Sequence, residues 1–382
     1  MLRRGTRTPS LFTYQEELVE QVLGVCRPGA KALLSLPTGS GKTRTAMTAV
    51  YRAMAAGLVR RVVWLAPTRE LLQQAQRTAV AIWNDYDAAP DVQLGPWPVY
   101  ATDVEHSVLF GTPQAVWRRV PDHVLASPPD LVVFDEAHQL GAPTFRAAVE
   151  SLRVGNSPAA VLGLSATPGR TDEEETDRLV EQFERNLLRS ASLGEHPVEA
   201  LQRIGVLAKL QFKQLSKRHI AEYERGRRLA VLVRACQHLA GGSGRSLVFA
   251  DSVAAAMVLA QALRECGVAA AAIHGELQED ERDRRLHDFS VGRLSVLTNH
   301  RLLATGYDCP AITDVLLGQR IGSQITFEQV VGRVARGPRT GGSRLGRIWQ
   351  FENHLEMHGL PRSYYRYRDF DWKAGLRGSE HS

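Results

Sequence analysis

The sequence predicts an α/β protein made of two similar units in tandem. Short apolar runs alternate with helical periodicity between residues 31 and 134, and the same alternation begins again near Leu247. This pattern is typical of parallel sheets covered by helices. The length of 382 residues leaves room for two domains at about 100 to 200 residues each. We expect the first domain to span residues 1–194 and the second to span residues 195–382, with a C-terminal tail over about residues 356–382.

Four apolar runs predict the buried strands of the first domain. They cover residues 32–36, 61–66, 131–134 and 161–166. Short runs without alternating polar residues suit strands that are buried on both faces of a parallel sheet. Between the first two runs, Met47, Val50 and Met54 recur at spacings of three and four residues. This spacing predicts a helix that packs one face onto the sheet.

The second domain repeats the order of strand, helix and strand. A strand should end at Ala250, and a helix should follow over residues 253–265 with Asp251 or Ser252 as its N-cap. The next strand should end at Ile273. Ahead of this unit we expect a weak strand near residues 205–212, a charged helix over residues 217–239, and a flexible connection at residues 241–244.

Composition excludes several classes of protein. Hydrophobic residues make up 44% of the chain and charged residues 23%, which is typical of a folded globular protein and not of a disordered or fibrous one. No run of about 18 apolar residues could span a bilayer, and no apolar core of a signal peptide follows the N-terminal arginines. We therefore expect a cytoplasmic protein. The four cysteines lack metal-ligand spacing, which favours reduced thiols over zinc ligands or disulfides.

The net charge of +6 suits a partner that is a polyanion, although many proteins with other partners share it. The distribution of charge is more informative. Six arginines and a single acidic residue, Glu328, lie between residues 320 and 350. Aromatic and charged residues also alternate over residues 364–372. That last stretch could form a nucleic-acid platform, but a tail that docks on its own domain is the favoured interpretation.

The segment PTGSGKT follows a predicted buried strand and opens a predicted helix. In that context the backbone N–H groups of a glycine-bearing loop point toward a helix N-terminus, where phosphate is favoured. Lys42 would neutralise the β- and γ-phosphates of a nucleotide, and the Thr43 hydroxyl would bind Mg²⁺. Leu36 stands where the general pattern has its first glycine. The loop residues expected to bind nucleotide are Thr38, Gly39, Ser40, Gly41, Lys42 and Thr43; the alternative is a glycine-rich turn with no ligand.

The segment FDEAH follows the predicted strand at residues 131–134. Ligands of α/β proteins bind at the carboxyl ends of the strands, so Asp135 should lie beside the phosphate loop. Asp135 could then hold Mg²⁺ through water, and Glu136 could orient and deprotonate the attacking water. An acidic pair after a strand is a weak signal by itself. Together with the phosphate loop, it indicates a hydrolase.

The segment QVVGRVAR, residues 329–336, supplies cations. Arg333 and Arg336 are three residues apart and should share one helix face. Both could reach the developing charge on a γ-phosphate as arginine fingers. A solvated basic helix is the alternative.

The chain resembles the superfamily 2 helicases and translocases, which are built from two RecA-like domains with ATP between them. The resemblance covers nearly the whole chain and rests on eight motifs in the family's order. These are PTGSGKT (residues 37–43), APTREL (66–71), GTP (111–113), DEAH (135–138), SAT (165–167), LVFADS (247–252), LTNHRLLATGYDCP (297–310) and QVVGRVAR (329–336).

The resemblance also implies roles for individual residues. The sugar–phosphate backbone of the nucleic acid would be contacted by Thr68, Arg69, Thr112 and Pro113 in the first domain and by Thr298 and Asn299 in the second. Ser165 and Thr167 would couple hydrolysis to domain movement, with His138 and Gln329 as polar links across the cleft. Gly306 and Asp308 would lie on the nucleotide side. Gln15 resembles the residue that reads the adenine edge; the alternative for it is an ordinary amphipathic helix start.

The sequence contains signals for both DNA and RNA as the polymer. Gln329 stands where DEAD-box RNA helicases usually have histidine, and the segments at residues 165–175 and 13–20 resemble the type III restriction-enzyme motors and DNA repair helicases. This favours DNA, whereas APTREL also matches RNA helicases. Contacts to phosphate and sugar would make binding independent of sequence. We therefore expect an ATP- and Mg²⁺-dependent DNA helicase or translocase, which could act with protein partners in a larger complex. The alternatives are an RNA-remodelling ATPase and a scaffold that binds nucleic acid without hydrolysis.

Overall fold

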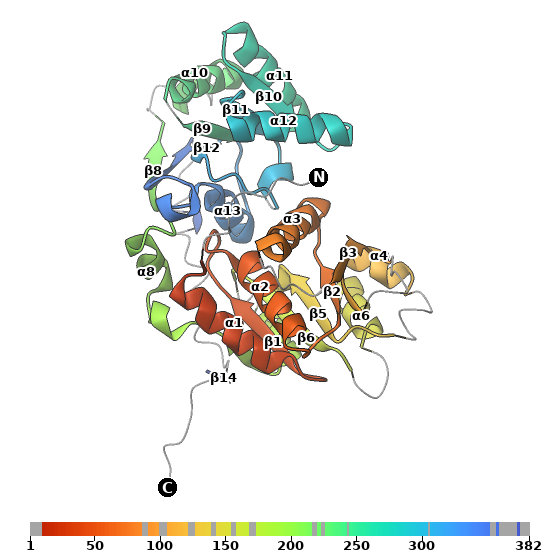
Figure 1. Ribbon diagram of the computed structural model, residues 1–382. Coiled ribbons are helices and arrows are strands. Elements are labelled where there is room, and N and C mark those ends of the chain that lie inside the picture. Colours follow the sequence, from red (N-terminus) through yellow and green to blue (C-terminus); the bar gives the residue numbers. More distant parts are fainter. Residues whose placement is uncertain are drawn as a thin grey trace. The chain divides into compact units, whose positions relative to one another are not determined.

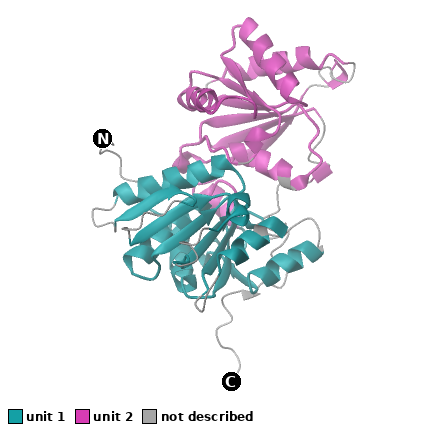
Figure 2. Cartoon of the chain, turned by 90° about the vertical axis from the view of Figure 1, so that its right-hand side faces the viewer, with its two compact units in different colours: residues 1–37, 41–196, 363–382 teal, residues 38–40, 197–362 magenta. Residues whose placement is uncertain are grey.

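The computed structural model describes residues 10–85, 91–98, 105–120, 127–138, 143–153, 158–167, 173–215, 220–222, 226–242, 244–304, 306–351, 357–358 and 373–374. Residues 168–172, which belong to one segment of the family resemblance, and the aromatic stretch at residues 364–372 lie outside these ranges. The chain divides into two compact units (Figure 2). The first comprises residues 1–37, 41–196 and 363–382, and the second comprises residues 38–40 and 197–362.

The first unit is built on a parallel sheet with the strand order β14-β7-β1-β6-β5-β2-β4-β3. Its strands are β1 (Lys31–Ser35), β2 (Arg61–Leu65), β3 (Val92–Pro96), β4 (His106–Gly111), β5 (Leu131–Asp135), β6 (Ala160–Ser165), β7 (Asn186–Leu188) and β14 (Lys373–Ala374). The four strands predicted from apolar runs appear as β1, β2, β5 and β6. The predicted α/β class is confirmed.

Helices cover both faces of this sheet (Figure 1). They are α1 (Thr13–Val25), α2 (Lys42–Ala55), α3 (Arg69–Asp85), α4 (Pro113–Arg118), α6 (Pro143–Ser151) and α7 (Glu173–Gln182). The chain moves one way across the sheet from β1 to β3 and the other way from β4 to β7. Because crossovers between parallel strands are right-handed, α2 and α3 lie on one face, and α4, α6 and α7 lie on the other. Leu33, Val63 and Val132 face the second group and form its core.

The second unit has its own parallel sheet, with the order β10-β11-β9-β12-β13-β8. Its strands are β8 (Lys209–Gln214), β9 (Arg245–Phe249), β10 (Ala270–Ile273), β11 (Val296–Asn299), β12 (Ile312–Leu317) and β13 (Leu345–Gln350). Its helices are α8 (Pro197–Arg203), α10 (Arg228–Ala240), α11 (Val253–Glu265), α12 (Glu279–Val291) and α13 (Gln324–Val331). Apolar cores lie on both faces, one against α10 and α11 and the other against α12 and α13.

Short 3₁₀ helices complete the described elements: η2 (Ala191–Leu193), η3 (Leu302–Ala304), η4 (Gly332–Val334) and η5 (Pro338–Thr340). Helix α11 has the predicted bounds, and its N-cap is Ser252, whose hydroxyl accepts a hydrogen bond from the Ala255 N–H at 3.0 Å. Within the described ranges, no helix has the length and apolar character needed to cross a bilayer.

Two segments differ from the sequence prediction. The helix expected over residues 217–239 is interrupted: residues 220–222 are helical, Gly226 lies in a turn with a positive φ of 83°, and α10 begins at Arg228; residues 216–219 and 223–225 lie outside the description. Strand β14, in the stretch that we expected to be a tail of the second domain, pairs with β7 of the first sheet. Two residues, Lys373 and Ala374, are too few to leave an apolar pattern in the sequence.

Candidate functional site

One edge of the first sheet gathers most of the predicted site residues of that unit. Strands β1, β6, β5, β2 and β4 are consecutive neighbours and run parallel, so their carboxyl ends lie along the same edge. In that order these ends lead into the loop at residues 37–43, the SAT segment at 165–167, the DEAH segment at 135–138, Thr68 and Thr112. The sheet thus brings together segments that are far apart in the sequence.

The loop after β1 has the backbone of an anion site. Gly39 and Gly41 have positive φ angles of 87° and 89°, a conformation that a side chain would strain. Gly41 is the N-cap of α2, which begins at Lys42. The first N–H groups of a 14-residue helix therefore face the loop, where they favour negative charge. Lys42 Nζ lies 3.4 Å from the Leu36 carbonyl oxygen, so the residue that replaces the expected glycine supplies a backbone acceptor for the lysine.

Gln15 is buried against this loop. Its Oε1 accepts a hydrogen bond from the Phe12 N–H at 3.1 Å, as in an ordinary helix N-terminus. Its Nε2 is so close to Gly41 that a Cβ added there would lie 2.6 Å away. The Gln15 side chain therefore caps α1 and also lies against the loop at residues 37–43, and adenine recognition stays a prediction.

Two carboxylates follow β5. Asp135 is buried, and burial, with added repulsion from Glu136, raises its pKa to about 7 in spite of the opposing effect of Lys42. Glu136 has a positive φ of 54°, which is uncommon for a residue with a Cβ. Its N–H donates to Asp135 Oδ1 at 3.0 Å, and its Oε2 lies 3.3 Å from His138 Nδ1. His138, which was predicted to be a polar link, is thus placed against Glu136.

The donors present suit a divalent cation. Mg²⁺ prefers oxygen ligands and is usually held by one or two carboxylates together with phosphate oxygens. Asp135 and Thr43 supply such oxygens from segments that follow β5 and β1, the two strands that flank β6. A carboxylate whose ionised form is disfavoured by burial gains from a nearby positive charge. The residues therefore fit Mg²⁺.

Ser165 and Thr167 lie at the carboxyl end of β6, between the loop at residues 37–43 and the DEAH segment. The Ser165 hydroxyl donates to the Thr167 carbonyl at 2.7 Å, and the Thr167 N–H donates back to Ser165 Oγ at 3.0 Å. The Ser165 carbonyl accepts from the Leu36 N–H at 3.3 Å. The SAT segment is therefore tied to the start of the phosphate loop through backbone and hydroxyl groups.

Thr68 and Thr112 cap the helices that follow β2 and β4. Thr68 Oγ1 accepts from the Leu71 N–H at 3.3 Å, and Thr112 Oγ1 accepts from the Ala115 N–H at 3.2 Å. A threonine hydroxyl that accepts still has one hydrogen to donate, which suits a phosphate oxygen. Arg69 is exposed beside Thr68, whereas Pro113 is buried and anchors α4. Pro113 therefore has a packing role at this surface.

The basic segment of the second unit is not one helix, which corrects the prediction that Arg333 and Arg336 share a helix face. Helix α13 ends at Val331, Arg333 lies in η4, and Arg336 forms an isolated antiparallel bridge with Leu207. Backbone bonds from Ala208 to Ala335 and from Gly337 to Val206 hold this stretch in extended pairing. The pairing with residues 206–208 draws the chain out of helical conformation.

Both arginines are held by the loop after β11. Arg336 makes a two-pronged ion pair with Asp308, with Nε 3.0 Å from Oδ1. Arg333 donates to the carbonyls of Tyr307 and of Gln329, the latter at 3.1 Å. Gly306, in the same loop, has a positive φ of 73°. The sequence does not reveal that the Tyr307 carbonyl accepts from Arg333, because every residue type has a backbone carbonyl.

Thr298 and Asn299 lie in the interior of the second unit. Both are fully buried. Thr298 Oγ1 donates to the Ala256 carbonyl at 2.7 Å, and Asn299 Nδ2 donates to the Val248 carbonyl at 3.1 Å. These side chains are committed to the fold and are not available to a polymer on the surface, which corrects the sequence prediction for both.

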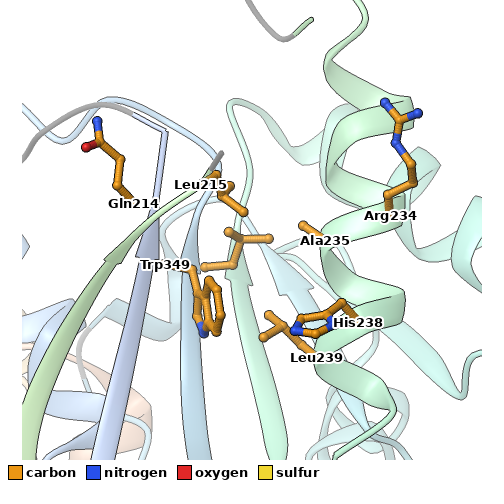
Figure 3. A pocket seen from close by; sticks show the side chains of 8 residues that line it. Gln214, Leu215, Arg234, Ala235, His238, Leu239 and Trp349 are labelled. Carbon is orange, nitrogen blue, oxygen red and sulfur yellow. The ribbon is translucent and has the colours of Figure 1, made fainter. Parts of the chain in front are cut away.

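The second unit also contains a pocket of about 290 Å³ between α10 and the sheet (Figure 3). Leu239, Leu316 and the indole of Trp349 line it, and His238 contacts Trp349 edge to face with ring centroids 6.1 Å apart. None of the predicted site residues lines this pocket.

Comparison with known proteins identifies related families. A family model described as the type III restriction enzyme res subunit matches residues 8–170, and a model of the helicase conserved C-terminal domain matches residues 228–338. The nucleolar RNA helicase 2-A of Xenopus laevis is 27% identical over 338 residues, covering 82% of this chain and 41% of the relative. The putative ATP-dependent helicase IRC3 of Saccharomyces cerevisiae is 24% identical over 367 residues, covering 88% and 51%. The chain thus spans about half the length of these curated relatives.

A solved structure has a similar fold. The Mycobacterium smegmatis helicase Lhr bound to ssDNA and AMP-PNP matches with a TM-score of 0.63 and 21% identity, over 90% of this chain and 46% of that chain.

Proposed function

We propose an ATP-driven, DNA-directed motor activity for this chain, which belongs to the superfamily 2 helicases and is related to the motors of type III restriction enzymes. The observation that carries the proposal is the order of segments along one sheet edge. The phosphate loop and the two carboxylates lie after β1 and β5, and the capping threonines lie after the adjacent strands β2 and β4. A nucleotide site and a polymer site can therefore share a single rigid edge.

The proposed chemistry assigns one task to each group. The loop N–H groups and Lys42 bind the β- and γ-phosphates of ATP, while Asp135 and Thr43 would hold Mg²⁺, which would neutralise phosphate charge. Glu136 accepts the proton of the water that attacks the γ-phosphorus as the bond from that phosphorus to the β–γ bridging oxygen breaks. The contact with His138 Nδ1 at 3.3 Å limits the directions that the Glu136 carboxylate can take. Arg333 and Arg336 of the second unit stabilise the developing negative charge.

The ATPase rate with and without polymer tests this proposal. We expect single-stranded nucleic acid to stimulate hydrolysis, and Lys42→Ala and Glu136→Gln each to abolish it. The Glu136→Gln variant keeps the shape of the side chain and should still bind ATP, which separates loss of chemistry from loss of binding. Arg178→Gln, at an exposed ion pair with Glu174 on α7 of the same unit, is the control and should hydrolyse ATP at the wild-type rate. Turnover that is indifferent to polymer and to both site substitutions would rule out the motor.

The preference for DNA is tested in the same assay. The match of residues 8–170 to a restriction-enzyme subunit supports DNA, whereas relatives named as RNA helicases, such as the Xenopus protein, support an RNA-remodelling ATPase as the second candidate. We expect single-stranded DNA to stimulate hydrolysis more than RNA of equal length and base composition. The reverse order would move the protein to the RNA class.

A further inference from the structure

Trp117 is an exposed aromatic residue on a well-anchored element. Its side chain is 58% exposed, more than any other large hydrophobic side chain in the described ranges. The helix that carries it, α4, is fixed to the first unit by buried Pro113 and Val116 and packs against α6. An indole that is held rigidly in solvent is an unusual use of a large apolar surface. An exposed aromatic ring at this position suits a ligand with an apolar face.

The charges around Trp117 indicate the class of ligand. Arg118 and Arg119 follow it directly and are exposed, and neither guanidinium has an acidic partner within the part of the chain that the structure describes. Gln114, Trp117 and Arg118 have spacings of three and four residues, so they share one face of α4. An aromatic surface beside two unpaired cations complements a ligand that has both flat rings and negative charge.

The position of α4 links this surface to the proposed polymer site. Helix α4 begins directly after β4, and the Ala66 N–H donates to the Gly111 carbonyl at 3.2 Å, which ties the loop before Thr68 to the loop before Thr112. Trp117 is five residues beyond Thr112, or about 7.5 Å along a helix axis. That distance corresponds to about two nucleotides at the spacing of one duplex strand.

We propose that Trp117 is a base-stacking platform for single-stranded nucleic acid, with Arg118 and Arg119 contacting the adjacent phosphates. The inference rests on the proposed function and extends it from backbone contacts to a contact with a base. The base that stacks on Trp117 must expose a face, which paired and stacked bases inside a duplex do not offer. The platform therefore selects single strands over duplexes. It is tolerant of sequence, because every base has such a face.

A protein partner is the other class of ligand that could bind an exposed tryptophan beside two arginines. Nucleic acid is favoured here because α4 begins directly after the capping Thr112, and because Arg118 and Arg119 have no ion-pair partner within the described ranges. A protein-binding role would leave nucleic-acid affinity unchanged on substitution of Trp117, so the experiment below separates the two.

The test compares two fluorescein-labelled oligonucleotides of equal length, one of single-stranded oligodeoxythymidine and one with the same backbone but abasic sugars. Trp117→Ala should weaken binding of the first by about fivefold to 150-fold, the range for loss of one base–aromatic stack. The same substitution should leave binding of the abasic strand unchanged. Trp117→Phe should retain most of the affinity for the first strand. Leu58→Ala, at a side chain that is 47% exposed before the amino end of β2, is the matched control and should bind both strands as the wild type does.

Salt dependence separates the arginines from the indole. The slope of log K against log salt concentration changes by about 0.7 for each phosphate contact to a single strand. Arg118→Gln and Arg119→Gln should each reduce this slope, whereas Trp117→Ala should lower affinity with the slope unchanged.

Failure of this inference can be told apart from failure of the proposed function. Wild-type protein that binds neither oligonucleotide would overturn both. Wild-type binding that Trp117→Ala leaves intact, or weakens equally for both strands, would overturn the stacking role alone.

Discussion

At the scale of single residues, the candidate site depends on groups that hold other groups in place. His138 lies against Glu136, the Leu36 carbonyl lies near the Lys42 ammonium, and Asp308 pairs with Arg336. Each of these partners limits the freedom of a side chain that is proposed to act on phosphate. A guanidinium with a fixed direction loses less entropy when it reaches a ligand.

The ion pair of Asp308 with Arg336 gives a prediction at this scale. Asp308→Asn removes the charge and one acceptor from a two-pronged contact, and a hydrogen bond to a charged group contributes about 1.5 kcal/mol or more. We expect kcat for polymer-stimulated ATP hydrolysis to fall about tenfold, with the thermal midpoint little changed. Asp288→Asn, at another aspartate–arginine pair of the same unit, is the matched control and should keep the wild-type kcat. Equal rates for both variants would assign Asp308 to local stability.

At the scale of secondary-structure elements, helix N-termini set the positions of several functional groups. Gly41 starts α2 at the phosphate loop, Thr68 and Thr112 start the helices after β2 and β4, and Ser252 starts α11. A capped N-terminus fixes the first turn of a helix. The same residues therefore set the helix boundary and place N–H groups or hydroxyls at the carboxyl edge of a sheet.

Helix α11 offers a stability test for such a cap. Ser252→Ala removes the acceptor for the Ala255 N–H, and loss of a serine N-cap costs about 1 kcal/mol. We expect urea unfolding of the second unit to shift to lower concentration with the slope unchanged. Ser290→Ala is the control, because the Ser290 hydroxyl donates to the His287 carbonyl near the end of α12 and caps no N–H group. A Ser252→Ala variant as stable as the control would mean that the start of α11 is frayed.

At the scale of the whole molecule, the proposed motor needs groups from both units in one reaction. The phosphate loop and the carboxylates follow strands of the first sheet, whereas Arg333 and Arg336 belong to the second unit. A nucleotide can drive movement only if it binds one arrangement of the units more tightly than another. Arg333 and Arg336 are the groups through which the second unit would respond to the nucleotide.

Substitution of Arg333 tests this cooperation between units. Arg333→Ala should lower kcat by about 10³ if the residue acts as an arginine finger, while binding of ATP to the first unit persists. The comparison is with Arg344→Ala, an exposed arginine of the same unit, which should hydrolyse ATP at the wild-type rate. Undiminished turnover after loss of Arg333 would show that its contacts with Tyr307 and Gln329 serve the fold.

The sequence by itself determined strands β1, β2, β5 and β6, the glycine-bearing loop at residues 37–43 and the place of the acidic pair after β5. Apolar runs such as residues 131–134 have to be buried wherever they occur, and the glycines at 39 and 41 can adopt positive φ without strain. These properties are local, so residue type and spacing reveal them. Helix α11 was predicted to the residue for the same reason, because its cap and its apolar face are both encoded within 14 positions.

Only the tertiary structure decided which polar residues are available to a ligand. Thr298 and Asn299 belong to a segment typical of the family, yet backbone carbonyls of neighbouring elements satisfy them in the interior. Arg336 leaves the predicted helix because residues 206–208 pair with residues 335–337 through backbone hydrogen bonds and an isolated bridge. The exposure of Trp117 depends on how α4 packs. Whether a polar or an aromatic side chain is buried, paired or exposed is set by segments distant in sequence, so residue type and spacing do not reveal it.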